Sequence, residues 1–111
     1  MSLDSKVSAG EKFNLKRLVA NVSDSIVSRT ILKNTAGNVT LFAFAKGQGL
    51  SKHTAPFDAL VYICEGEATV TIGESDSELK EGEAIIMPAN IPHALNAKSN
   101  FKMLLVMIKN L

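Results

Sequence analysis

The side chains of this sequence that could carry chemistry are its two histidines, His53 and His93, and one nearby carboxylate, Asp58. Neutral imidazole nitrogen binds Zn, Ni, Cu and Fe ions, and two imidazoles with one carboxylate form the ligand set of many non-heme Fe(II) sites. Two imidazoles alone bind such ions weakly, so water, a carboxylate or a substrate must complete the shell. The three residues therefore suggest either a metal centre or a ligand pocket.

The elements that must position these residues are short strands. From residue 25 onward, short apolar segments alternate with clusters of Gly, Asn, Pro and Asp, which is typical of a β-sandwich or barrel. In residues 68–72, ATVTI, apolar and hydroxyl residues alternate as in a strand with one face in the core. The expected strands cover residues 25–32, 39–45, 58–64, 68–72, 77–79, 84–87, 93–97 and 101–108. The sequence thus predicts an all-β domain.

The N-terminal part of the chain has a different texture. Residues 11–20, EKFNLKRLVA, place Phe13, Leu15, Leu18 and Val19 near one side of an expected two-turn helix. Several expected strands are apolar on both faces, so their outer sides must be covered by this helix or by a second subunit. A homodimer is the more economical of the two solutions and is the expected assembly.

Composition excludes several classes of protein. A chain of 111 residues fits one compact domain, and 12 basic residues against 11 acidic ones, without runs of like charge, give no footprint for nucleic acid or an anionic membrane. The longest apolar runs are far shorter than the roughly 20 residues of a membrane helix. The lone Cys64 cannot form an internal disulfide, and no export signal is evident. A cytoplasmic setting is expected.

Two longer stretches, residues 47–67 and 82–96, carry glycines, a proline and both histidines at fixed spacing. They resemble the two signature motifs of the cupin family of small barrels, G-x5-H-x-H-x3,4-E-x6-G and G-x5-P-x-G-x2-H-x3-N. The matching positions are Gly47, His53, Gly66, Gly82, Pro88 and His93. The resemblance implies a double-stranded β-helix, or jelly-roll, cupin barrel over residues 39–111. Residues 1–38 would then form an N-terminal extension of a short helix and edge strands.

The resemblance also implies a ligand set, from which the sequence departs. Metal-binding cupins offer two His and one Glu from the first motif and one His from the second. Here the second histidine position is Ala55 and the glutamate position is Ala59, so His53 and His93 remain as the implied ligands. A regular strand would turn Asp58 away from the pocket, whereas a bulge at the strand entrance would turn it inward and complete a three-ligand set.

The pocket expected at the barrel mouth is mostly apolar, with the two histidines as its polar groups. Its expected lining is His53, His93, Ala59, Val61, Phe44 and Met87. Such a pocket favours binding of a small, partly apolar organic ligand, with a divalent Fe, Zn, Ni or Mn ion weakly bound there or absent. The alternative is a metal-dependent enzyme of the dioxygenase or isomerase type that uses His53, His93 and Asp58. A third reading is a vestigial pocket in which the histidines make only local hydrogen bonds.

Overall fold

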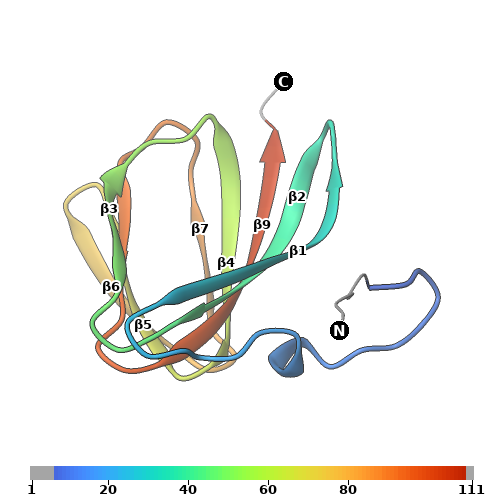
Figure 1. Cartoon of the computed structure of the whole chain (residues 1–111). Helices are drawn as coiled ribbons and strands as arrows, with labels where there is room; N and C mark the ends of the chain where they lie inside the picture. Colours follow the sequence, from blue (N-terminus) through green and yellow to red (C-terminus); the bar gives the residue numbers. More distant parts are fainter. Residues whose placement is uncertain (1–6, 110–111) are drawn as a thin grey trace.

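The computed structural model describes residues 7–109, which form two antiparallel sheets facing each other as a jelly-roll barrel (Figure 1). The larger sheet has the strand order β1-β2-β9-β4-β7 and the smaller one β3-β8-β5-β6. The strands are β1 (Ile26–Asn34), β2 (Gly37–Phe44), β3 (Gly49–His53), β4 (Phe57–Glu65), β5 (Glu67–Ile72), β6 (Ser75–Lys80), β7 (Ala84–Met87), β8 (His93–Asn96) and β9 (Phe101–Lys109). The predicted all-β jelly roll is confirmed.

One strand was not expected from the sequence. β3 contains a single large apolar residue, Leu50, and its other residues are exposed, so it lacks the alternation that marks a half-buried strand. Pairing with β8 at the edge of the smaller sheet nevertheless makes it a strand. His53 is therefore the last residue of a strand and not part of a loop that precedes one.

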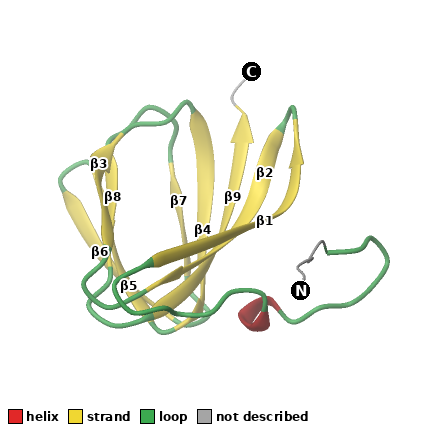
Figure 2. Cartoon of the chain, viewed as in Figure 1, coloured by secondary structure: helices red, strands yellow, loops and turns green. Residues whose placement is uncertain are grey.

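The N-terminal helix is shorter than predicted. A single 3-10 turn, η1 (Leu15–Arg17), replaces the expected two-turn helix over residues 11–20 (Figure 2). The side chain of Asn14 makes no capping hydrogen bond, and so short a helix has little stability of its own. Packing decides the local conformation instead. Leu15, Leu18 and Val19 lie against the outer face of the larger sheet, over Leu41, Ala43 and Cys64.

The main core lies between the two sheets. In β4 the side chains of Ala59, Val61 and Ile63 alternate into it, and the rings of Phe44 and Phe101 stack there with centroids 4.7 Å apart. The boundary expected between residues 38 and 39 falls within β2. Within residues 7–109 no helix has the length and apolar character needed to cross a bilayer.

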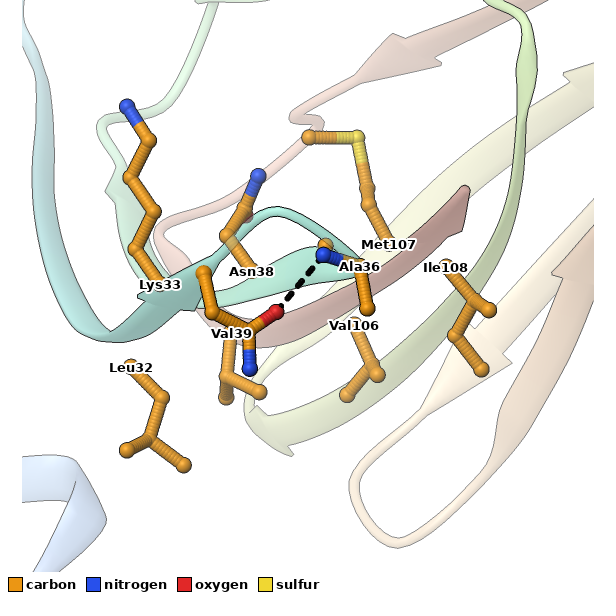
Figure 3. Close-up of a pocket in the computed structure, with 10 residues that line it drawn as sticks. Leu32, Lys33, Ala36, Asn38, Val39, Val106, Met107 and Ile108 are labelled. Atoms are coloured by element: carbon orange, nitrogen blue, oxygen red, sulfur yellow. Dashed lines mark hydrogen bonds between the residues drawn. The ribbon is translucent and has the colours of Figure 1, made fainter. Parts of the chain in front are cut away.

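The outer face of the larger sheet carries a continuous apolar row. Strand pairing places five residues side by side across all five strands, in the order Leu32, Val39, Val106, Leu60 and Ile86. Figure 3 shows the first three of these, together with Ile108, on the same side of the ribbon. Ile86 is 62% exposed and Leu32 66%. The N-terminal segment packs over Leu41, Ala43 and Cys64 beside this row and leaves much of the row in solvent.

Candidate functional site at the barrel mouth

A cavity of about 70 Å³ lies at the end of the barrel where β9 finishes and β4 begins. Its wall contains two imidazoles, two thioethers and otherwise only carbon side chains. The lining residues are Leu50, His53, Ala55, Phe57, Ala59, Met87, His93, Leu95, Leu105 and Met107. No carboxylate, ammonium or guanidinium group is part of this lining. The two histidines are therefore its only hydrogen-bonding side chains.

An irregularity in β3 brings His53 into the cavity. Leu50 pairs with Leu95 and His53 pairs with His93, so three steps along β3 match two steps along β8. In a regular strand, residues three apart point to opposite faces. The extra residue of the bulge cancels that reversal, and both Leu50 and His53 face the cavity.

The two imidazoles contact each other. Their ring centroids are 4.4 Å apart with an angle of 67° between the planes, in an edge-to-face arrangement. The Nδ1 atom of His53 lies 2.7 Å from the carbonyl oxygen of Ser51, and that of His93 lies 3.1 Å from the carbonyl oxygen of Ile91. A carbonyl only accepts, so each Nδ1 carries the proton and donates it. In the neutral imidazoles both Nε2 atoms then keep a free lone pair.

The two histidines differ in their exposure. His93 is only 5% exposed, whereas His53 lies at the rim and is exposed. Within residues 7–109 no hydrogen-bond partner reaches either Nε2 atom. The site therefore has two neutral nitrogen atoms with free lone pairs, one inside the barrel and one at its edge. Each can bind a metal ion or accept a hydrogen bond.

Asp58 does not join the histidines. β4 pairs regularly with β9 at this point, Asp58 opposite Ile108 and Ala59 opposite Met107, and the irregularity of β4 comes later, between Ile63 and Glu65. The carboxylate points outward, where its Oδ1 accepts a hydrogen bond of 2.9 Å from the main-chain N–H of Ala89. The bulge that would have turned Asp58 inward is absent from the strand entrance, so Asp58 takes the outward position of a regular strand and does not line the cavity. Among residues 7–109 no group of three or more His, Cys, Asp or Glu side chains could hold one ion.

The other expected lining residues divide into two groups. Ala59 and Met87 line the cavity, whereas Val61 and Phe44 are fully buried in the core beneath it. Sequence reasoning missed six wall residues, which are Leu50, Ala55, Phe57, Leu95, Leu105 and Met107. Counting back by two from Ala59 would have found Phe57. The sequence of β9 did not indicate that Leu105 and Met107 face the cavity, because this strand is apolar on both faces.

The divalent metal implied by the resemblance can be tested against these donors. A four-ligand centre of that kind needs a carboxylate and a third imidazole, and the corresponding positions, Ala59 and Ala55, place only methyl groups in the wall. Two imidazoles supply only half of a four-ligand shell, and being neutral they offset none of the charge of the ion. The residues present therefore do not fit the conventional divalent centre.

A larger hollow of about 210 Å³ lies at the turn between β1 and β2 (Figure 3). Its polar side chains are Lys33, Asn34 and Asn38, and the Oδ1 atom of Asn34 already accepts a hydrogen bond of 2.7 Å from the N–H of Ala36. This bond closes the turn. The hollow contains no pair of groups that could exchange protons or bind a metal, so we regard it as structural.

Cys64 is the other side chain with reactive potential. It is buried beneath the N-terminal segment on the outer face of β4, away from the cavity. Burial raises the pKa of its thiol, which lowers the thiolate fraction at neutral pH. The thiol is therefore a packing group.

Comparison with known proteins places this chain in a family. A family model described as the cupin domain matches residues 40–109. A conserved protein of unknown function from Streptococcus pyogenes is 37% identical, with a TM-score of 0.90 over 100% of this chain and 97% of that one. A cupin 2 conserved barrel domain protein from Leptotrichia buccalis is 39% identical, with a TM-score of 0.85 over 87% of this chain and 47% of that one. No curated protein matches. The chain belongs to the cupin family.

Proposed function

We propose that this cupin is a binding protein whose ligand enters the barrel-mouth cavity and is held by His53 and His93. One observation carries the proposal. Two adjacent imidazoles present free Nε2 lone pairs in a wall that is otherwise apolar and uncharged. A few converging polar groups in an apolar concave site are typical of small-molecule binding.

The cavity restricts the chemistry of the ligand. Both Nε2 atoms accept hydrogen bonds, so the group that enters must donate one, as a hydroxyl or an N–H does, or must be a metal ion. A carboxylate would meet two acceptors and no donor. The cavity volume of about 70 Å³ is well below the roughly 300–1,000 Å³ of pockets that enclose a whole drug-sized ligand. Only a small group therefore enters, and the rest of the ligand lies at the rim beside His53.

The enzymatic alternative has no observation in its favour, since the outward position of Asp58 removes its third ligand. A divalent ion at His53 and His93 stays a prediction with only two protein ligands behind it. Placement in the cytoplasm also stays part of the proposal, consistent with a free and buried Cys64.

A matched pair of small ligands tests the proposal. n-Butanol and butyrate have the same carbon chain, but only the alcohol donates a hydrogen bond at pH 8. We expect butanol to shift the NMR signals of His93 and of the Leu95 methyl groups, and we expect butyrate to leave them unchanged. The shift of the Leu95 methyl signals should disappear in His93→Ala and weaken in His53→Ala. Equal shifts with both ligands, or shifts that survive in both variants, would contradict the proposal.

A further inference from the structure

Two thioethers flank the position where the family motif has its glutamate. Ala59 pairs with Met87 on one neighbouring strand and with Met107 on the other, so the three residues form a row across β7, β4 and β9. All three line the cavity. The small side chain of Ala59 leaves space between two flexible side chains that each contain a thioether sulfur.

The same cavity wall contains the two histidines. Met87, Met107, His53 and His93 all line this cavity of about 70 Å³, so the four side chains border one small volume. The site therefore has two neutral nitrogen donors and two neutral sulfur donors. Four donors of these kinds can form a tetrahedral shell around one ion.

Both the type and the charge of these donors select the ion. Oxygen ligands suit Mg, Ca and Mn ions, whereas thioether sulfur favours soft, monovalent Cu(I). The cost of moving an ion from water into an apolar site rises with the square of its charge, and no carboxylate in this wall offsets a second positive charge. A neutral site of nitrogen and sulfur therefore disfavours divalent ions and accepts Cu(I).

We propose that His53, His93, Met87 and Met107 form a binding site for Cu(I). The proposal rests on the proposed function, because it names an ion as the ligand of the same cavity. It differs from the conventional metal centre of the family, since sulfur from β7 and β9 replaces the missing carboxylate and the missing imidazole.

Competition for Cu(I) with the chromophoric chelator bicinchoninate, under anaerobic reducing conditions, tests this site. All variants carry Cys64→Ala, because a thiol would bind Cu(I) by itself. We expect one Cu(I) per chain, at least tenfold weaker binding in Met87→Leu and in Met107→Leu, and Cu–S and Cu–N scattering in X-ray absorption. The matched control is Met103→Leu, which changes a fully buried core methionine outside the cavity and should bind within twofold of the parent.

Several outcomes would overturn the copper site. They are failure to take Cu(I) from the chelator, unchanged binding in the Met87→Leu/Met107→Leu double variant, and stoichiometric retention of Zn(II) after desalting. Butanol binding that persists while Cu(I) binding fails would reject the copper site and leave the proposed function standing. Loss of the histidine dependence of butanol binding would instead reject the proposed function.

Discussion

His53 and His93 pair directly across β3 and β8, and each imidazole donates its Nδ1–H to the carbonyl oxygen two residues before it. Each ring is thus held by its own hydrogen bond to the nearby main chain, and no other side chain is needed. A hydrogen bond on one ring nitrogen sets the tautomer and leaves the other nitrogen as an acceptor or metal ligand. Because His93 is buried and His53 exposed, the two rings should contribute differently to folding.

Replacing each histidine by alanine separates its role in folding from its role in binding. We expect His93→Ala to lower the free energy of unfolding by about 1–3 kcal/mol, because a partly buried hydrogen bond to the carbonyl oxygen of Ile91 is lost and a void replaces a buried ring. His53→Ala should change it by no more than about 0.5 kcal/mol, as at most exposed positions. Urea unfolding measures both. If the pocket were vestigial, the parent protein itself would bind neither butanol nor Cu(I).

The outward position of Asp58 leads to a second prediction. Its carboxylate fixes the connection between β7 and β8 through the N–H of Ala89, so Asp58→Ala should cost about 0.5–1.5 kcal/mol of stability. Ligand and Cu(I) affinities should stay within twofold of the parent, because the side chain lies outside the cavity. Calorimetry and the chelator competition measure the two effects. A loss of bound metal in Asp58→Ala would show that the aspartate reaches the site after all.

The local sequence pattern predicted most of the strands, because alternating apolar and polar residues, bounded by turn residues, identify a strand that buries one face. It failed at β3, whose identity comes from pairing with β8 and not from its own residues. The bulge before His53 is also a product of that pairing. Sequence spacing could place His53 at the barrel mouth by family resemblance, but it could not show how the side chain reaches the inner face.

The wall of the site was harder to predict than its histidines. Asp58 follows the regular register of β4 with β9, and only long-range pairing decides that register. Met107 lies in a strand that is apolar on both faces, so alternation gave no indication of which residues point inward. The inner face becomes evident only when the N-terminal segment is seen to pack on the other side of the sheet.

The ion pair between Glu78 and Lys98 predicts a small pH dependence of stability. Glu78 accepts hydrogen bonds from Lys98 at 2.9 Å and from Thr69 at 3.0 Å, which lower the pKa of its carboxyl, and the bond to Glu78 raises the pKa of Lys98. A carboxyl group whose pKa is lower in the folded than in the unfolded state stabilises the fold at any pH above its unfolded-state pKa. This stabilisation disappears as the pH falls through the folded-state pKa. The contribution of Lys98 to stability disappears only at alkaline pH, as the pH rises through the raised pKa of its ammonium group in the folded state.

Thermal unfolding of Glu78→Gln at low salt checks this dependence. The parent should have the higher Tm at pH 7, and the difference should shrink as the pH falls into the range where carboxyl groups protonate. Both side chains are exposed, so the effect is small and added salt should reduce it further. Glu74→Gln, in the turn between β5 and β6, is the control. A difference that grows on acidification would contradict the assignment.

The homodimer stays a prediction, and the apolar row on the larger sheet is the surface that favours it. The row crosses five strands at about 4.8 Å spacing, a width of roughly 19 Å, and contains no charged member. A flat apolar sheet face can stack on a second copy of itself, as the two sheets of a β-sandwich do. Isolated exposed apolar residues are common on monomers, but a contiguous row of them is typical of an interface.

A charge placed in this row should separate the subunits without unfolding them. Ile86 is 62% exposed in the single chain, so Ile86→Lys should leave the Tm of the isolated subunit nearly unchanged while it places an ammonium group in the stacked face. We expect light scattering to report a dimer for the parent and a monomer for Ile86→Lys. The matched control is Val22→Lys, since Val22 is 50% exposed and lies outside the row. A parent that stays monomeric at high concentration would reject the dimer, and a dimer that survives Ile86→Lys would move its interface to another face.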